Sequence, residues 1–520
     1  MGARYDPRAE ACLTALTTGP RPHTAGIGLV AALEDAERFS GLVCSTPGET
    51  VAVIEYLLAL IYASRHVPRT TQQWRTWVDD PDGLKKAAQW LRERPDDEWN
   101  LFDPDQPLGQ NRALAKFIDT EGVGPAQLAI EQAGDYNQFF DHRHLHATEP
   151  MPAGQAFRAL LTQMAYGLGG NAKIKPGLLG RGMFSQSVAR LGGRVRVVAL
   201  GRTLGHTLRL NTAPATSRLL GTFNRSWTDE RGPERRSFRG AKVERDPDGL
   251  ADVHSFLCRS VFLRPVRLAD GSFAVDQVLV GSGELLPPLL NSQFAQDAVM
   301  VDDKDRRTLT PLKASPDRAL WREAHALYAA VAERQQGEDL YGRLAGLPEQ
   351  HINLWAVGLV ARQSAPTAWV ADEFPYVSGR EQEFRTAAKT ASEICEYLAV
   401  ALRDAADTAS AVVYPNPKPA DKATHRARFN GAPQMWAGAG DHFHMLLDAI
   451  AEKVPLHETL PVFVRSLAAL AGEALDARLR SLPDRGAGMR ARLEARHRLR
   501  TALNHKKKAP DFLKEALRDA

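Results

Sequence analysis

The stretch DEFPYVSGREQEFRTAAKTASEICEYLAVAL, residues 372–402, divides the sequence into two parts of different character. Apolar residues in its second half recur at steps of three and four, as on the buried face of a helix: they are Phe384, Ala387, Ala391, Ile394, Leu398 and Leu402. From about residue 378 the pattern is almost wholly helical, whereas helix and strand patterns mix before it. We therefore expect an α+β protein, with a large mixed α/β N-terminal domain over 1–377 and a C-terminal four-helix bundle over 378–520.

The predicted bundle has three further helices, near 441–452, 460–475 and 487–506. The middle one repeats the same spacing, with Leu460, Phe463, Leu467, Leu470 and Leu475.

The last of these helices is strongly basic. Its segment MRARLEARHRLRTALNHKKK, 489–508, offers Leu493, Leu499 and Leu503 for burial and a single acid, Glu494. The cations around them are Arg490, Arg492, Arg496, Arg498, Arg500, Lys506, Lys507 and Lys508. Such a cluster favours a phosphate-binding surface, for which we select Arg492, Arg496, Arg500 and Lys507; the alternative is a solvated helix face.

Local signals place several elements of the N-terminal domain. STPGETVAVIEYLLALIYAS, 45–64, begins with a capping box, since Thr46 precedes Pro47 and Glu49 follows. Further helices are expected at 70–77 and 82–93. From about 190 to 300 the period changes to two: RVRVVAL, 194–200, predicts a half-buried strand, and SVFLRPVRLADGSFAVDQVLV, 260–280, predicts a hairpin turning at Asp270-Gly271.

Composition limits the classes of partner. The net charge is only +4, with 66 basic and 62 acidic residues, so a nucleic-acid partner requires clustered charge. The four cysteines, at 12, 44, 258 and 395, form no Cys-x-x-Cys pair, which suits a reducing cytosol. The apolar stretch VAVIEYLLALIYA, 51–63, is interrupted by Glu55 and too short for a bilayer, and the N-terminus lacks an apolar signal. We expect a cytoplasmic protein without a membrane partner.

AYGLGGNAKIKPGLLGRG, residues 165–182, holds six glycines and three cations. Gly167 to Ala172 satisfies the Gly-x-Gly-x-x-Gly/Ala pattern of dinucleotide-binding proteins, which would make the chain a nucleotide-dependent oxidoreductase. The preceding GQAFRALLTQMAY has helical rather than strand spacing, however, and Pro176 interrupts the segment after the pattern. A surface loop without a ligand is a second alternative. We favour a bare backbone that approaches nucleic acid, with the cations meeting phosphate.

Other chemistry has little support. His142, His144 and His146 have metal-like spacing, but no partner residues complete a site, so packed or solvated histidines are the better interpretation. Nucleophile elbows and paired catalytic carboxylates are absent from the sequence. We therefore expect no enzyme, no metal and no cofactor.

Five segments, in order, resemble the CasA family, the large subunit of the type I-E CRISPR Cascade complex. They are EWNLFDPDQPLGQ (98–110), YNQFFDHRH (136–144), GLGGNAKIKPGLLGRG (167–182), DRALWREAHALY (317–328) and NLWAVGLVARQSAPTAW (353–369). A helical C-terminal region comes after them, as in the family.

The resemblance implies a non-catalytic subunit of an RNA-guided complex, which recognises the protospacer-adjacent motif in duplex DNA through the minor groove. It implies as partners the other Cascade subunits, the guide RNA, double-stranded target DNA and a helicase-nuclease that degrades the target.

The resemblance also assigns residues. Gly167, Gly169 and Gly170 match the family's glycine loop, with Asn171 and Lys173 beside them to meet a base edge or a phosphate. Gln363, which comes directly after Arg362, matches the family's wedge glutamine, and Phe139 and Phe140 lie in the loop that reaches toward the guide RNA.

The sequence departs from the family pattern at three places. Leu108-Gly109 replaces the usual Phe-x, no cysteine cluster is present, and no lysine lies between Lys242 and Lys304, where the family has a groove-reading lysine. The bases that form the recognised motif therefore stay open.

Overall fold

The computed structural model describes residues 2–131, 149–171, 185–227, 235–236, 244–287, 294, 299–303, 308–315, 319–333, 339–348, 350–362, 365–505 and 507–518. The chain divides into two compact units. The N-terminal unit comprises 1–320, 334–347 and 352–373, and the C-terminal unit comprises 321–333, 348–351 and 374–520. The division near residue 374 lies within the stretch where the sequence pattern changes.

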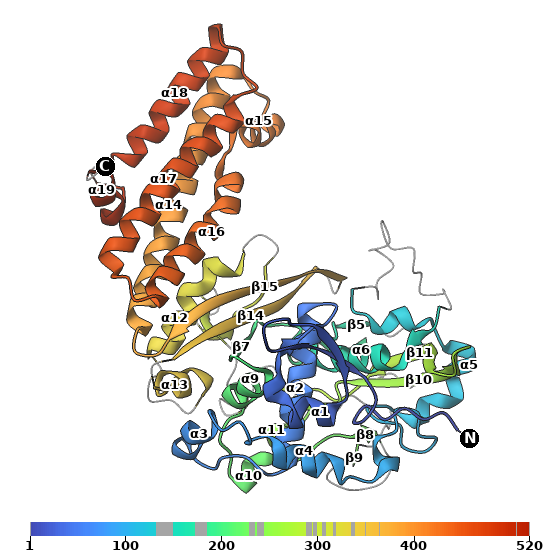
Figure 1. The fold of residues 1–520 in the computed structure, drawn as a ribbon. Helices are drawn as coiled ribbons and strands as arrows, with labels where there is room; N and C mark the ends of the chain where they lie inside the picture. Colours follow the sequence, from blue (N-terminus) through green and yellow to red (C-terminus); the bar gives the residue numbers. More distant parts are fainter. Residues whose placement is uncertain are drawn as a thin grey trace. The chain divides into compact units, whose positions relative to one another are not determined.

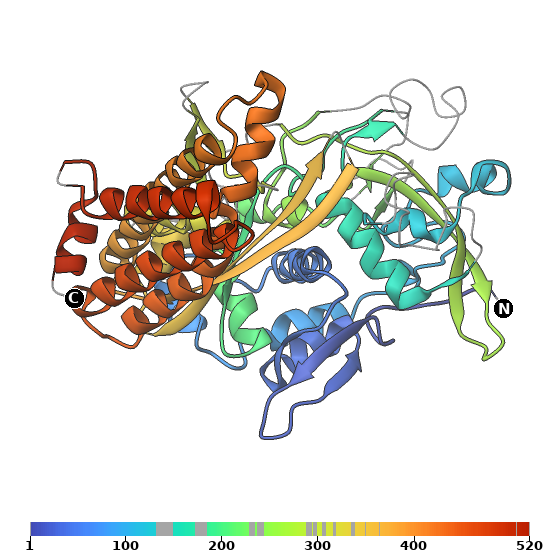
Figure 2. The ribbon, with the colours of Figure 1, turned by 90° about the horizontal axis from the view of Figure 1, so that it is seen from above.

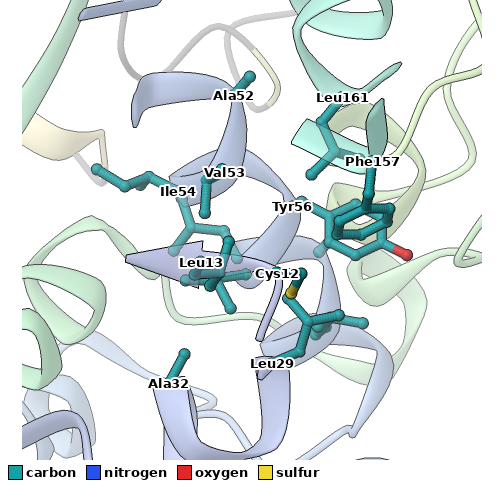
Figure 3. Packing of buried hydrophobic residues seen from close by; sticks show 14 of the residues in the cluster. Cys12, Leu13, Leu29, Ala32, Ala52, Val53, Ile54, Tyr56, Phe157 and Leu161 are labelled. Atoms are coloured by element: carbon teal, nitrogen blue, oxygen red, sulfur yellow. The ribbon is translucent and has the colours of Figure 1, made fainter. Parts of the chain in front are cut away.

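Helix α2 (Pro47–Ala63) is the centre of the N-terminal core. It is buried on nearly every side, from Val51 to Tyr62, and its neighbours are α4 (Lys85–Arg92), α6 (Ala153–Tyr166), α9 (Leu204–Asn211) and α11 (Leu250–His254). Figure 3 shows Tyr56 of α2 against Phe157 of α6, whose rings meet edge to face with centroids 5.6 Å apart. An apolar helix without a polar face is stable only when surrounded in this way.

The predicted start of α2 is confirmed. Thr46 Oγ1 accepts a hydrogen bond from the Glu49 amide at 3.1 Å, and Pro47 occupies the first helical turn. Glu49 Oε2 in return accepts from the Ser45 amide at 2.9 Å, so the box closes one residue earlier than the sequence suggests. The helices predicted at 70–77 and 82–93 are α3 (Thr71–Trp77) and α4.

Within the described residues, three three-stranded sheets and three two-stranded sheets surround this core. Their strand orders are β2 (Thr24–Ile27)–β1 (Leu13–Thr17)–β3 (Phe39–Leu42), β10 (Arg259–Arg267)–β11 (Phe273–Ser282)–β4 (Met151–Pro152), β15 (Ala365–Val377)–β14 (His351–Arg362)–β7 (Arg196–Leu200), β12 (Met300–Asp303)–β13 (Thr308–Pro311), β5 (Gly170–Asn171)–β6 (Ser185–Gln186), and β8 (Ser226–Trp227)–β9 (Arg235–Arg236).

Short helices connect the strands: α1 (Leu29–Glu34), α5 (Ile118–Glu121), α10 (Ser217–Leu220) and α13 (Leu340–Ala345). The helices α9, α10 and α11 interrupt the region from 190 to 300, which the sequence pattern assigned to strands alone. The predicted hairpin is confirmed as β10 and β11, which pair antiparallel on either side of Asp270-Gly271.

The prediction for β7 was only partly right. The strand exists, but Arg196 is 2% exposed rather than on a solvent face. Glu55 of α2, the charge that interrupts the apolar stretch, accepts from Arg196 Nε at 2.8 Å, from His254 Nδ1 at 2.7 Å and from Arg190. Buried charges are tolerated when they are paired in this way.

The segment 98–110 builds the core rather than an exposed site. Gln110 is fully buried; its Nε2 donates to the Leu101 carbonyl at 2.5 Å and its Oε1 accepts from the Leu263 amide of β10 at 2.8 Å. The family-like pattern here therefore reflects packing.

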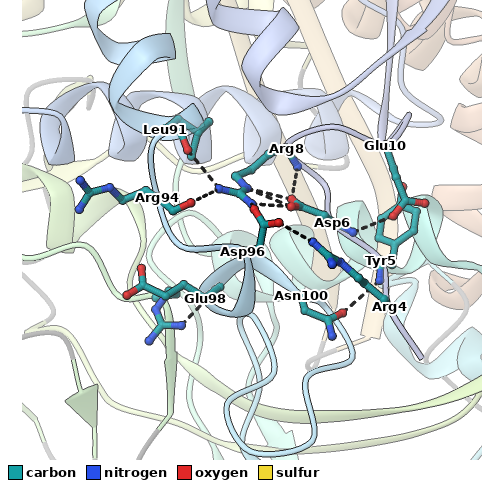
Figure 4. Close-up of polar contacts among 11 residues, drawn as sticks. Arg4, Tyr5, Asp6, Arg8, Glu10, Leu91, Arg94, Asp96, Glu98 and Asn100 are labelled. Carbon is teal, nitrogen blue, oxygen red and sulfur yellow. Dashed lines mark hydrogen bonds and ion pairs between the residues drawn. The ribbon is translucent and has the colours of Figure 1, made fainter. Parts of the chain in front are cut away.

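A polar network fixes residues 4–10, which lie before the first strand (Figure 4). Arg8 donates to both carboxylate oxygens of Asp6, to Asp96 at 2.6 Å and to the carbonyls of Leu91 and Arg94. Because Arg8 lies almost wholly inside the protein, these contacts replace the water that its guanidinium loses.

The C-terminal unit is built on four long described helices that form a bundle: α14 (Glu381–Val413), α16 (Ala432–Ala451), α17 (Leu456–Leu479) and α18 (Gly486–Leu503). They lie side by side in both ribbon views (Figure 1, Figure 2). The short helices are α12 (Ala324–Glu333), α15 (Lys422–Phe429) and α19 (Asp511–Arg518).

The burial predicted for this bundle is right on α14 and partly wrong on α18. Phe384, Ile394 and Leu402 are fully buried, and Leu499 is buried, but Leu493 is 59% exposed. On α18 the residues facing the bundle are the small Ala491 and Ala495, which let the helix pack closely and turn Leu493 outward.

Within the described residues, no helix combines the length and the apolar character that crossing a membrane requires.

Candidate nucleic-acid interface

The glycine segment contributes one arm of a hairpin on the N-terminal unit, β5 (Gly170–Asn171), and the other arm is β6 (Ser185–Gln186). Helix α6 ends at Tyr166, and β5 begins three residues after Gly167. Gly170 pairs with Gln186 and Asn171 with Ser185, in antiparallel register. Gly170 has a φ of +148°, which a residue with a side chain rarely adopts, and both Gly170 and Asn171 are exposed. The result is an accessible stretch of backbone with little side-chain cover.

The dinucleotide alternative is wrong for this geometry. That pattern binds a pyrophosphate where a strand turns into a helix. Here a helix precedes the glycines and an antiparallel hairpin comes after them.

The base of the hairpin is anchored by backbone bonds. The Ala189 amide donates to the Gly167 carbonyl at 2.8 Å, and the Leu191 amide donates to the Ala165 carbonyl at 2.9 Å. Gln186 Nε2 donates to the Val280 carbonyl of β11 at 3.1 Å, which ties β6 to the neighbouring sheet. The exposed residues Gly170 and Asn171 are therefore held on a fixed base.

A buried arginine lies beneath the hairpin. Arg259 of β10 is 1% exposed; its Nη2 donates to the Leu168 carbonyl at 2.7 Å and its Nη1 to the Cys258 carbonyl at 2.9 Å. Among the described residues it forms no ion pair, and burial lowers the pKa of its guanidinium. Sequence reasoning missed Arg259; the only signal was a lone charge in the apolar run SFLCRSVFL, 255–263.

The glycines differ in how much space surrounds them. A Cβ at Gly167 would lie 2.6 Å from Arg259 Nη2 and 2.6 Å from the Gln163 carbonyl oxygen. At Gly169 the nearest atom, Val188 Cγ2, would be 3.4 Å away, and at Gly170 nothing lies within 4 Å. Gly167 is therefore required by packing, whereas a Cβ at Gly169 would make only ordinary van der Waals contacts and one at Gly170 would face open space. Val188 itself is 53% exposed.

The second predicted DNA-reading segment lies beside the first. Arg362 is the last residue of β14, and β14 and β15 are neighbours in one sheet. In both ribbon views, the end at which β14 passes into β15 lies beside β5 (Figure 1, Figure 2). Tyr166, at the end of α6, meets Trp369 of β15 edge to face, with ring centroids 4.8 Å apart. The fold thus joins two segments that are about 200 residues apart in the sequence.

Several nominated residues lie outside the described part of the chain. They are Phe139 and Phe140, Lys173, Gln363 and the histidines at 142, 144 and 146. For Arg362 the structure describes the backbone alone. Within the described ranges, no group of three or more His, Cys, Asp or Glu side chains could hold a metal ion.

The cations of α18 are more neutralised than the sequence indicates. Arg492 pairs with Asp484 and also donates to the carbonyls of Leu479, Arg480 and Leu482, so it ties the start of α18 to the end of α17. Arg496 pairs with Asp476 at 2.7 Å.

Two other arginines of α18 are also paired, Arg490 with Glu494 at 2.6 Å and Arg498 with Asp404 at 2.9 Å. Arg500 and Lys507 are exposed and form no ion pair with any described residue. Of the four selected cations, these two are the ones available to a phosphate.

Comparisons with known proteins give a consistent result. A family model described as CRISPR-associated protein Cse1 matches residues 17–476. The crystal structure of Thermus thermophilus CasA is similar with a TM-score of 0.74 and 20% identity, over 96% of this chain and 100% of that chain. Cse1 from Acidimicrobium ferrooxidans has a TM-score of 0.71 and 18% identity, over 99% of each chain. A chain of a solved CRISPR RNA-guided surveillance complex has a TM-score of 0.67 and 20% identity, over 95% and 99%. No curated protein matches.

These matches define the class as the non-catalytic large subunits of type I-E CRISPR Cascade. Because the family model covers most of the sequence, the chain belongs to the Cse1 family, also called CasA. The resemblance found in five short segments is confirmed, and so is the predicted fold class.

Proposed function

We propose that this chain recognises the short motif beside the target in duplex DNA and helps to start strand separation, as the large subunit of an RNA-guided Cascade complex. Its partners in this role are the other Cascade subunits, the guide RNA, the target duplex and a helicase-nuclease, in accord with the surveillance complex whose chain shares its fold. In that division of labour, base pairing reads the target and the protein reads only the adjacent motif.

The observation that carries the proposal is that the end of α6, directly before the glycine hairpin, contacts the β14–β15 pair through Tyr166 and Trp369. The hairpin supplies bare backbone at Gly169 and Gly170, which a narrow minor groove can accommodate. Asn171 and Lys173 would contact a base edge or a phosphate. Arg362, the last residue of β14, and Gln363, which follows it in the sequence, would act next to them, with Gln363 as the wedge beneath the motif.

The remaining proposals give each part of the chain a further nucleic-acid contact. We propose that the N-terminal domain, 1–377, also approaches the guide RNA through Phe139 and Phe140. The C-terminal bundle, 378–520, would hold the DNA backbone, with Arg500 and Lys507 as its open cations and with Arg492 and Arg496 contributing only if they exchange their carboxylate partners.

The direct test is Gly169→Asp in the assembled complex. The new side chain has room in the protein, so it places bulk and negative charge only where the groove would lie. We expect affinity for motif-bearing duplex to fall roughly tenfold or more, because a single groove contact is worth about 1–3 kcal/mol. Gel-shift titration measures this, and gel filtration checks assembly.

The matched control is Gly41→Asp on β3, which adds the same charge at another open position of the same unit. It should leave the affinity unchanged. Equal affinities of both variants and the wild type would refute the role of the hairpin.

A further inference from the structure

The end of the bundle where α17 passes into α18 carries a second group of cations, which lie on α15, just before it, at the end of α17 and in the turn after α17. Figure 1 shows α15 beside this end, and the chain after α15 packs on α17, where a Cβ at Gly431 would lie 2.9 Å from the Ala474 carbonyl carbon. We call this group the bundle-tip surface. Its members are all exposed, and they are Lys418, Lys422, Arg428, Arg478, Arg480 and Arg485.

The bundle-tip surface differs from the face of α18 in its ion pairing. On α18, Arg490, Arg492, Arg496 and Arg498 each have a carboxylate partner. None of the six tip cations has an ion-pair partner among the described residues, although Arg426 nearby pairs with Asp407. The two segments 414–431 and 478–485 contain two acids: Asp484 is engaged by Arg492, and the exposed Asp421 remains against the six cations. Positive potential is therefore concentrated at the tip rather than along α18.

The segment that carries these cations is firmly attached to the bundle. Phe429, at the end of α15, is fully buried. The rings of Tyr414 and His425 stack with centroids 3.8 Å apart, and Arg428 Nη1 donates to the Tyr414 hydroxyl at 2.7 Å. Because α15 is already ordered, binding there costs less conformational entropy than binding to a flexible basic tail.

We propose that the bundle-tip surface binds the phosphate backbone of the target DNA, as a site separate from the motif-reading hairpin; this inference rests on the proposed function. Lysines and arginines without carboxylate partners on a fixed helix suit a polyanion, whose phosphates release counterions on binding. A protein partner fits less well, because interfaces need buried apolar or aromatic anchors. Among the described residues, no large apolar side chain is exposed in 414–431 or 478–485, the segments that carry the six cations; the exposed Met489 and Leu493 lie outside these segments, on α18.

The test compares two triple variants of the full chain in the assembled complex. The tip variant is Lys418→Ala, Lys422→Ala, Arg480→Ala, and the control is Arg490→Ala, Arg498→Ala, Lys514→Ala. Both remove three positive charges from the same unit, but only the control residues are paired with acids. Affinity for duplex DNA, with and without the motif, is measured from 50 to 300 mM salt, and circular dichroism checks the helical content of each variant.

We expect the tip variant to bind both duplexes more weakly and to flatten the plot of log affinity against log salt by up to about 0.9 for each phosphate that it no longer contacts. The control should change the slope by less than the equivalent of one phosphate. Equal slopes for wild type and tip variant would overturn the inference. Equal losses in both variants would also overturn it, because net charge alone would then explain the effect. Unaltered DNA binding with impaired assembly would indicate a protein partner instead.

The outcomes for the two proposals are separable. Loss of preference for the motif concerns the hairpin and the proposed function, whereas the salt slope on either duplex reports the tip. If the wild-type complex bound DNA without preference for the motif, the proposed function would be refuted. The slope of log affinity against log salt would still decide whether the bundle-tip surface binds the phosphate backbone.

Discussion

At the scale of single residues, the glycines of this motif have different reasons to be glycine. Gly167 is required by packing, whereas we assign Gly169 to DNA binding. Gly167 is enclosed by Arg259 and by the Gln163 carbonyl, whereas Gly169 has ordinary contact distance on its open side. The sequence motif does not distinguish Gly167 from Gly169, because both are glycines of the same pattern. Their difference arises from β10, which comes about 90 residues later in the chain.

This difference predicts opposite effects on stability. Gly167→Ala should lower the free energy of unfolding of the isolated subunit by about 1–3 kcal/mol, because the new methyl group must displace a buried guanidinium or a backbone carbonyl. Gly169→Ala should change it by less than about 0.5 kcal/mol. Urea unfolding followed by tryptophan fluorescence measures both. If Gly167→Ala were as stable as the wild type, the enclosed position of Gly167 would be incorrect.

Asp252 gives a prediction about pH. It is fully buried, and it accepts from Arg245 Nη2 at 2.8 Å, from Asn224 Nδ2 at 2.6 Å and from the Asp248 amide at 2.9 Å. Burial alone raises the pKa of this carboxyl, but the hydrogen bonds and charge of Arg245 outweigh burial, so the pKa lies below its usual 3.8. A lowered pKa means that the ionised group stabilises the fold above pH 3.8 and ceases to do so as the pH falls through the folded value.

Asp252→Asn should therefore lower the free energy of unfolding by about 3–5 kcal/mol at pH 7, because it leaves the largely buried Arg245 with one carboxylate partner fewer. The cost should be the same at pH 5 and should shrink below pH 4. Denaturant unfolding across this range measures it, with the exposed Asp246→Asn as control. A cost that grew on acidification would contradict the assignment.

At the scale of elements, local signals were sufficient wherever a helix or turn is set by neighbours in sequence. Thr46 and Glu49 lie three residues apart and determined the start of α2, and Asp270-Gly271 determined the β10–β11 turn. The burial of Arg196 could not be predicted, because its partner Glu55 lies 141 residues away. The same holds for α18, whose arginines are paired by Asp404 and Asp476 from other helices.

The β14–β15 pair carries the prediction for strand separation. Gln363 comes directly after the last residue of β14, and we expect Gln363→Ala to slow target opening more than it weakens the first contact with duplex, because a wedge acts as the strands part. Stopped-flow measurement of strand opening provides the rate. A target with a mismatched bubble beside the motif should restore the wild-type rate. If the variant opens the bubbled target just as slowly, the wedge role is wrong.

At the scale of the whole molecule, the change in periodicity near residue 378 predicted the fold class, a mixed α/β region followed by a helical region, and the bundle of α14, α16, α17 and α18 is that helical region. Residues 321–333 belong to the C-terminal unit although they come before the change, because α12 packs on α14; no pattern in the sequence indicated this. The adjacency of the glycine hairpin and the β14–β15 pair was also unpredictable from the residues alone, since it depends on the contact of Tyr166 with Trp369.

The central claim is that this subunit gives the complex its preference for a flanking motif. The most direct measurement uses a library of target duplexes with randomised flanking bases, selected for binding by the complex assembled with and without this chain. We predict that a flanking-base preference appears only with the chain present and that Gly169→Asp abolishes it. The same preference in the complex that lacks the chain would contradict the account.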